Sequence, residues 1–441
     1  MTEPYQTTSF FHPTTRLYRF SILFFVSLLT FGCYFAYDVI GAVAPSLIEE
    51  MGAQRGTVGT MYTMYSIAAI LSVFIGGLLI DRLGTRIASM IFSILVLVGA
   101  CIVAFSKSLP ILFAGRFIFG AGSEPLIVAQ VAIVARWFKE KEMALAFGIT
   151  LTVSRLGTLF SFNTGELIAS HFGGYHYALI AAILFCLISL LANIVYIFMD
   201  RHGESVLKLK EEEKGEKIVL RDIKYFGSSF WIITLLCTVF YSAIFPFTAL
   251  STDFFVDKWG IARTAEASGH FISQVFNNFF HMFSMAGGIT SIIIFASMIC
   301  APFAGLLVDR IGRRASLMVF GSIVMIPSYL IMGLTRIYPV YPMIILGIAF
   351  VLVPAAMWPS IPLIVKKEHV GTAFGLMTMI QNVGLGLFPL LNGILRDVTQ
   401  SYTASMVMFA SLGLCGLVFA LLLKKYDRRE GCILEKPSHM S

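Results

Sequence analysis

The feature that most constrains this chain is a series of apolar runs, each close to the length that a helix needs to cross a lipid bilayer. A helix spans a hydrocarbon core about 30 Å thick with roughly 20 residues. Because 57% of the 441 residues are apolar and only 13% are charged, lipid must surround much of the chain. This excludes an ordinary soluble enzyme and predicts an all-α membrane protein with twelve transmembrane helices. We place these spans at residues 20–44, 57–80, 86–106, 110–135, 143–168, 176–199, 230–252, 286–308, 315–335, 338–363, 369–395 and 401–424.

Basic residues are distributed unevenly between the two sides of the predicted membrane. The chain has 32 Lys and Arg residues and a net charge of +7. Most of these basic residues fall in the leader, in alternate loops and in the tail, which the positive-inside rule places in the cytoplasm. The charge therefore reports an orientation with both termini cytoplasmic, and we do not expect nucleic-acid binding. The polar leader at residues 1–19 and Asp38 in the first span indicate a retained helix rather than a signal peptide.

Two sequence matches at nearly one offset indicate an internal duplication. Residues 77–86 (GLLIDRLGTR) and 305–314 (GLLVDRIGRR) are identical at seven of ten positions with an offset of 228. The Ala-Phe-Gly segment that ends at Gly148 recurs ending at Gly375, with an offset of 227. A parallel repeat of six spans explains both matches.

The repeat divides the chain into two halves with a charged connection. We predict an amino-terminal six-helix half at residues 1–199, a cytoplasmic linker at 200–229 and a carboxy-terminal six-helix half at 230–441. The linker contains the charged run 208–217, for which a solvated surface helix is the simplest interpretation. Residues 264–284 have no counterpart in the first half and form an outer insert. One helical face of it would carry Ile272, Phe276, Phe279 and Phe283, as an interfacial helix or as an outward extension of a span.

The duplicated segment carries the pattern G-x-x-x-D-R-x-G-x-R, the signature loop of the major facilitator superfamily. The glycines would allow close helix approach, the aspartates would accept hydrogen bonds near a helix end, and the arginines would stay on the cytoplasmic side. Two interpretations remain open, a topology anchor and a latch that holds the halves in the outward-facing state. The residues of the two loops are Gly77, Asp81, Arg82, Gly84 and Arg86, with Gly305, Asp309, Arg310, Gly312 and Arg314.

Two charged residues lie near the middle of neighbouring predicted spans. Glu124 lies 11 residues from the inner end of its span, and Arg155 lies 12 residues from the inner start of the next. At about 1.5 Å per residue, their depths are nearly equal. A charge at mid-membrane costs at least about 2.5 kcal/mol, so something must compensate for each of them. The repeat places Val351 and Asn382 at the equivalent positions, which indicates that the fold itself does not require these charges.

This pair has two interpretations. It could be a structural salt bridge, or it could bind a zwitterion, with Arg155 holding a carboxylate through two hydrogen bonds and Glu124 holding an ammonium group. Rocking of the two halves about a central cavity would then give alternating access. Aromatic and amide residues would line side-chain pockets or would only pack, and they are Tyr34, Tyr37, Tyr241, Trp358, Gln381 and Asn382.

Further segments resemble the lysosomal dipeptide transporter family within the major facilitator superfamily. The resemblance runs from the first span to the last and implies facilitated transport of dipeptides on a fold of two six-helix repeats, without a coupled ion. It also implies that Glu124 and Arg155 match the acidic and basic peptide-binding residues of that family. The segments include residues 31–38 (FGCYFAYD), 115–124 (GRFIFGAGSE), 137–142 (WFKEKE), 245–247 (FPF), 358–359 (WP) and 371–375 (GTAFG).

The chain departs from that family in three places. Its leader has no acidic dileucine signal, the outer insert is extra, and no N-x-Ser/Thr sequon occurs. We therefore expect a relative in a cell (inner) membrane, with the lysosomal membrane as the alternative. An accessory glycoprotein subunit is not expected. The predicted partners are the lipid bilayer and a small solute, either a dipeptide or another zwitterion.

The same residues are compatible with other functions. Asp38 and Arg116 could relay a proton, or each could make a polar contact to a neighbouring helix. An organic anion or amphiphile transporter of the same fold, with Glu124 as proton carrier, is the main alternative, and a non-transporting membrane sensor is a remote one. The eight His residues are dispersed and no phosphate-binding loop occurs, so we expect neither an enzyme nor a cofactor or metal.

Overall fold

The computed structural model describes residues 12–138, 140–207, 220–265, 270–366 and 369–436. Within these ranges the chain is helical, with one isolated β-bridge between Ala262 and Met285. In the amino half, the helices are α1 (Arg16–Ala42), α2 (Ala44–Met51), α3 (Arg55–Phe105), α4 (Leu109–Trp137), α5 (Glu140–Phe172) and α6 (Tyr175–Leu207). In the carboxy half they are η1 (Leu220–Tyr225), α7 (Ser228–Thr248), α8 (Ser251–Trp259), α9 (Phe271–Phe280), η2 (Met282–Ser284), α10 (Ala286–Ile311), α11 (Arg314–Leu334), α12 (Val340–Met357), η3 (Trp358–Ser360), α13 (Ile361–Ile364), α14 (Val370–Thr399) and α15 (Thr403–Arg429).

The number of membrane spans agrees with the sequence. Ten helices in the described part of the chain are long and apolar enough to cross a membrane, and α10, bent by 55° within its length, gives an eleventh. The helix α3 has 51 residues and merges two spans, because Gly84 has φ 76° and ψ 162°, which are not helical angles. A side chain would strain the backbone there, whereas glycine adopts this conformation freely. The twelve predicted helices are therefore present.

The two halves are bonded to each other toward one end of the bundle, which we call the closed end and define by α2, α8 and the first turn of α3. Arg55 Nε donates to Asp253 Oδ2 at 2.6 Å, and Arg263 Nη2 donates to Glu49 Oε2 at 2.8 Å. The other hydrogen bonds that join the halves, among the described residues, also lie toward this end.

Glycines bring the helices into close contact near the closed end. A Cβ atom on Gly59 of α3 would lie 2.4 Å from the Pro389 carbonyl oxygen of α14, and one on Gly393 would lie 2.4 Å from the Arg55 carbonyl oxygen. Such distances leave no space for a side chain. The two helices therefore pack backbone against backbone across the interface between the halves.

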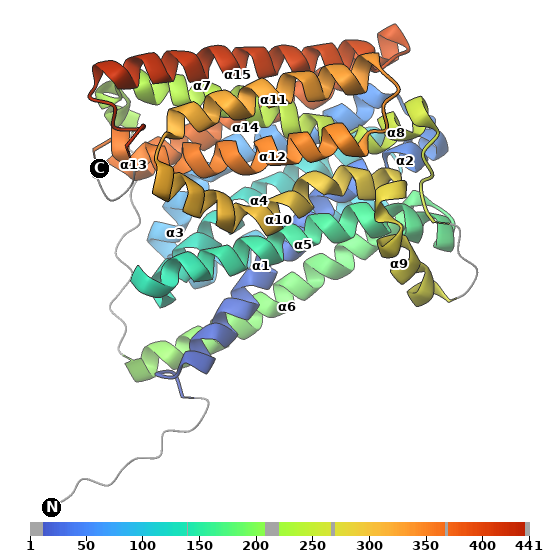
Figure 1. Cartoon of the computed structure of the whole chain (residues 1–441). Helices are drawn as coiled ribbons and strands as arrows, with labels where there is room; N and C mark the ends of the chain where they lie inside the picture. The colour runs from blue at the N-terminus through green and yellow to red at the C-terminus, as the bar shows by residue number, and fades with distance from the viewer. Residues whose placement is uncertain (1–11, 139, 208–219, 266–269, 367–368, 437–441) are drawn as a thin grey trace, which may run out of the picture.

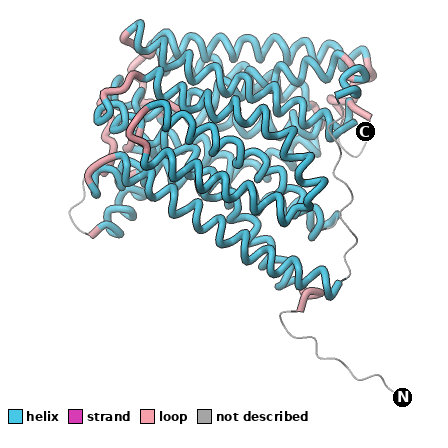
Figure 2. Tube along the Cα trace, turned by 180° about the vertical axis from the view of Figure 1, so that it is seen from behind, coloured by secondary structure: helices cyan, strands magenta, loops and turns pink. Residues whose placement is uncertain are grey.

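The opposite end of the bundle, which we call the open end, holds the described chain termini and both signature loops. In Figure 1, α1 and α6 diverge from the helices of the carboxy half toward this end, and Figure 2 shows the same divergence from behind. Helix α1 begins and helix α15 ends on this side in Figure 1, as an even number of spans requires.

The linker and the insert differ in detail from the sequence prediction. Helix α6 continues to Leu207, so the first residues assigned to the linker are helical, whereas the charged run 208–217 lies outside the described residues. In the insert, α9 is a separate short helix that projects from the bundle in Figure 1. Phe279 packs on Phe160 of α5 with ring centroids 5.5 Å apart, whereas Ile272 and Phe276 are exposed.

Candidate functional site

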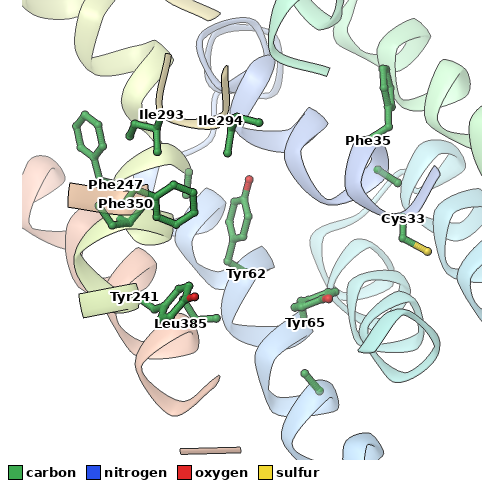
Figure 3. Packing of buried hydrophobic residues seen from close by; sticks show 14 of the residues in the cluster. Cys33, Phe35, Tyr62, Tyr65, Tyr241, Phe247, Ile293, Ile294, Phe350 and Leu385 are labelled. Atoms are coloured by element: carbon green, nitrogen blue, oxygen red, sulfur yellow. The ribbon is translucent and has the colours of Figure 1, made fainter. Parts of the chain in front are cut away.

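A cavity of about 210 Å³ lies between the two halves near the middle of the bundle. Helices α1, α3, α4 and α5 line it from the amino half, and α7 and α14 line it from the carboxy half. Figure 3 shows Tyr241 and Leu385 on one side of this region and Tyr65 on the other. The lining residues are Cys33, Tyr34, Tyr37, Asp38, Tyr65, Ser123, Glu124, Ile127, Arg155, Tyr241, Phe245, Gln381 and Leu385.

Glu124 is positioned by a tyrosine of the neighbouring helix. Tyr65 of α3 donates its hydroxyl to Glu124 Oε1 at 2.8 Å. This contact depends on Gly120, one turn earlier in α4, because a Cβ atom there would lie 2.5 Å from the Tyr65 carbonyl oxygen. The glycine lets α3 approach α4 closely enough for the tyrosine to reach the carboxylate.

Arg155 is surrounded by aromatic rings from both halves. Its guanidinium carbon lies 5.4 Å from the ring centroid of Tyr34, 5.7 Å from that of Phe245 and 5.5 Å from that of Phe350. Ring faces attract a cation, and more strongly when water is excluded. No hydrogen bond or ion pair of this guanidinium to another described residue is found, so its five donors remain available to a ligand in the cavity.

The cavity also holds a second carboxylate. Asp38 of α1 is 5% exposed and accepts a hydrogen bond of 2.6 Å from Thr158, which lies one helical turn after Arg155 on α5. Among the described residues, neither Asp38 nor Glu124 forms an ion pair with Arg155. The cavity therefore presents one basic and two acidic groups that do not neutralise each other by direct contact.

The structure brings most of the predicted binding residues together but not all of them. Trp358 lies behind the cavity wall and donates its indole N–H to the Tyr241 hydroxyl at 2.9 Å. Asn382 is 2% exposed and donates to the Thr378 carbonyl oxygen. Neither Trp358 nor Asn382 is among the residues that line the cavity in this structure, so their role in binding stays a prediction. Six of the eight predicted residues line it, namely Tyr34, Tyr37, Glu124, Arg155, Tyr241 and Gln381.

Arg116, a predicted relay residue, does not reach the cavity. It is 1% exposed, and its guanidinium donates to the carbonyl oxygens of Ala36 at 3.3 Å and Met61 at 3.4 Å. Asp38, the other predicted relay residue, does line the cavity. The two residues therefore have different environments.

The signature-loop glycines have two different roles in this structure. Gly84 and Gly312 have positive φ, 76° and 67°, where a side chain would be strained. A Cβ atom on Gly77 or Gly305 would meet no atom within 4 Å. The expectation of close helix approach at these two glycines is not met here, because both lie at the open end, where the halves diverge.

The charged residues of the first loop fix helices within the amino half. Arg86 bonds the carboxylates of Asp200 and Glu204 on α6, and Asp200 also accepts from Arg136 at 3.0 Å and from the indole N–H of Trp137 at 2.6 Å. In the second loop, the corresponding basic residue Arg314 lies near Asp309 and bonds the carbonyl of Lys436 in the tail. Both arginines therefore bond other segments of their own half of the molecule.

Sequence reasoning missed several cavity residues because they carry no charge. Tyr65 lies in the second predicted span without a distinguishing signal, and its role depends on the close contact at Gly120. Phe245 belongs to the segment 245–247, which carries part of the family resemblance and is the one signal that could have indicated it. The other missed residues are Cys33, Ser123, Ile127 and Leu385 at the cavity, with Phe350 over Arg155. No group of three metal-ligating side chains occurs among the described residues.

Sequence comparison decides the family. The Major Facilitator Superfamily pattern matches residues 26–275 and 270–436, which include both six-helix halves. The chain belongs to the major facilitator superfamily. As a member of this superfamily, it is a multi-pass membrane transporter rather than an enzyme.

Named relatives within the superfamily cover nearly the whole chain. The lysosomal dipeptide transporter MFSD1 of Danio rerio is 32% identical over 428 residues, covering 94% of this chain and 88% of the relative. The Homo sapiens protein of the same name is 29% identical over 440 residues, covering 95% and 88%. The crystal structure of a mutant form of the nucleoside transporter NupG superimposes with a TM-score of 0.69 at 12% identity, covering 92% of this chain and 99% of that one. This last similarity reports the fold alone.

Proposed function

We propose that this major facilitator protein transports dipeptides by alternating access, binding the substrate carboxylate at Arg155 and its ammonium group at Glu124. The observation that carries the proposal is the presence of both groups on one cavity without an ion pair between them. A structural salt bridge would bring the two side chains together, whereas a zwitterionic ligand needs them apart. The relatives named as dipeptide transporters support the same substrate class.

The shape and lining of the cavity favour a small amphipathic solute. Its volume of about 210 Å³ is below the roughly 300–1,000 Å³ of sites for drug-sized ligands. The planar guanidinium of Arg155 is suited to hold a carboxylate with two parallel hydrogen bonds, which a lysine cannot do. Tyr34, Tyr241 and Gln381 offer aromatic surface and an amide to the substrate side chains.

The carboxy half contributes apolar and amide groups, and the amino half contributes the charges. Phe245 and Phe350 of the carboxy half nevertheless reach Arg155 across the interface between the halves. Rocking of the halves would therefore change the surroundings of the basic group during the transport cycle. The affinity of Arg155 for a carboxylate would therefore fall as the halves separate.

The distribution of basic residues supports an orientation with both termini in the cytoplasm. The positive-inside rule assigns the open end, with both termini, to the cytoplasmic side, so that this structure corresponds to an inward-facing state with its outer side closed. We propose a cell (inner) membrane location, with the lysosomal membrane as the alternative. Release of the solute would then occur on the cytoplasmic side in this state.

Uptake by purified protein in lipid vesicles tests the proposal. We expect accumulation of a labelled dipeptide to its equilibrium level, inhibition by unlabelled dipeptides, and loss of uptake in Arg155→Ala with normal folding. Uptake that persists in Arg155→Ala would contradict the binding role. If organic acids compete and dipeptides do not, the protein transports organic anions instead.

A further inference from the structure

Arg116 of α4 is a fully buried cation held by aromatic rings rather than by an acid. Its guanidinium carbon lies 5.3–5.5 Å from four ring centroids, those of Tyr37, Tyr62, Tyr65 and Phe119. Two carbonyl oxygens accept from it, and its Nη2 atom has no hydrogen-bond partner among the described residues. Among the described residues, no carboxylate forms an ion pair with Arg116.

This arrangement is costly unless the charge is needed. A buried charge is normally paired with an opposite charge, because desolvation costs several kcal/mol. An apolar residue at position 116 could fill the same space between the rings without that cost. The positive charge of Arg116 therefore requires a reason beyond the packing of α1, α3 and α4.

Two of the four rings around Arg116 belong to residues of the cavity wall. Tyr37 and Tyr65 both line the cavity, and the ring of each also lies 5.5 Å from the Arg116 guanidinium carbon. Tyr65 also donates its hydroxyl to Glu124 at 2.8 Å. Positions 116 and 124 are eight residues apart in α4, which is about 12 Å along the helix. Tyr65 thus spans from the cation to the proposed ammonium-binding carboxylate.

With both carboxyl groups ionised, the formal charges of the amino half around the cavity sum to zero. Asp38 and Glu124 contribute two negative charges, and Arg155 supplies only one positive charge at the cavity. Arg116, one layer behind, supplies the second. A site of zero net charge can hold a zwitterion without binding or releasing a counter-ion, since charges in a low-dielectric region favour neutral combinations.

We propose that Arg116 is a positioning residue that fixes Tyr37 and Tyr65 and supplies the counter-charge that keeps the substrate-free site neutral. This inference rests on the proposed function. Arg116 contacts no substrate and carries no proton, in contrast to the relay role considered from the sequence. The ionisable groups facing the site from the packed helices are Cys33, Tyr34, Tyr37 and Asp38 of α1, Tyr62 and Tyr65 of α3, Glu124 of α4, Arg155 of α5 and Tyr241 of α7.

The consequence is a specific pH dependence in a variant. In the unsubstituted protein, the KM for a dipeptide should vary little between about pH 5 and about pH 8. Arg116→Met would leave one excess negative charge, which repels the substrate carboxylate until a carboxyl group of the site binds a proton. Its KM should therefore rise about tenfold from the low to the high end of this range. Arg116→Lys keeps the charge and should keep the flat profile.

The experiment measures KM for a labelled dipeptide in vesicles across this pH range, with thermal unfolding as the folding check. Arg136→Met is the matched control, because Arg136 is also an arginine of α4 but is only partly buried, bonds Asp200 and does not line the cavity. Its profile should stay flat. Tyr65→Phe, which keeps the ring and loses the hydroxyl, should raise KM without a pH dependence. A flat profile in Arg116→Met, or an unchanged KM in Tyr65→Phe, would overturn the role of Arg116. Absence of dipeptide uptake by the unsubstituted protein would overturn the proposed function as well.

Discussion

Asp397 of α14 accepts hydrogen bonds from the backbone N–H groups of Arg55 and Gly56, at 3.1 and 2.8 Å, and thereby caps helix α3 from the other half of the molecule. The residue that precedes α3, Gln54, makes no capping hydrogen bond with its side chain. The first N–H groups of a helix need acceptors, and a carboxylate there is favoured by the helix dipole. Closure of this end therefore provides a cap that separation of the halves would remove.

The first prediction concerns this cap. Asp397→Ala should weaken the closed end by about 1 kcal/mol, the usual value of a helix cap, and shift the populations of the two transport states about fivefold toward opening of this end. Distances between spin labels placed on α2 and α8 would measure the shift. Asp397→Asn retains an acceptor and should show a smaller change. Equal distance distributions for Asp397→Ala and the unsubstituted protein would contradict the cap's role in closure.

A second prediction concerns the latch interpretation of the signature loop. Asp81 is half-buried at the open end, and no hydrogen bond or ion pair with another described residue is found for it. If the loop holds the halves together only in the outward-facing state, Asp81→Asn should slow transport severalfold and leave dipeptide affinity unchanged in detergent. Titration calorimetry and vesicle uptake measure the two quantities separately. Lost binding in this variant would contradict the latch.

A third prediction concerns stability within the amino half. Asp200 is 0% exposed and accepts from Arg86, Arg136 and Trp137, so its removal leaves buried donors unpaired. Asp200→Ala should destabilise the protein by about 3 kcal/mol, the cost of breaking a buried ion pair.

The neighbouring carboxylate Glu204 provides the control for that comparison. It bonds Arg86 but its side chain is 37% exposed, so Glu204→Ala should cost less than about 1 kcal/mol. Thermal unfolding of the two variants in detergent tests the contrast. Equal loss of stability in both would show that burial of Asp200 is not what makes this cluster stabilising.

The sequence was sufficient for those features that hydropathy, charge and repetition encode directly. The length of the apolar runs predicts the spans, and the duplicated loop predicts the repeat. Comparison of the halves isolates Glu124 and Arg155, because their counterparts Val351 and Asn382 are uncharged. These signals are local or periodic in the sequence, so they can be interpreted without knowledge of how the helices pack.

The remaining features depend on how helices rotate against each other. Trp358 and Asn382 have suitable chemistry, but neither is among the residues that line the cavity, and each forms a hydrogen bond within the carboxy half. Tyr65 reaches Glu124 only because Gly120 brings two backbones together. A Cβ atom on Gly77 would meet no atom within 4 Å, because the helices diverge at the open end. A single sequence does not specify which transport state is populated, so it does not predict this divergence.

The central claim assigns each of two charged residues to one end of the substrate. Its most direct test combines substitution of each residue with chemical modification of each substrate end. The measurement is the affinity of the purified protein for an unmodified, an N-acetylated and a C-amidated dipeptide by titration calorimetry, in the unsubstituted protein, Glu124→Gln and Arg155→Gln. We predict that acetylation weakens binding at least about tenfold in the unsubstituted protein and has little effect in Glu124→Gln, since the lost contact is already absent. Amidation should behave in the same way with Arg155→Gln. Full sensitivity to acetylation in Glu124→Gln, or to amidation in Arg155→Gln, would contradict the assignment of these residues to the two ends of a zwitterion.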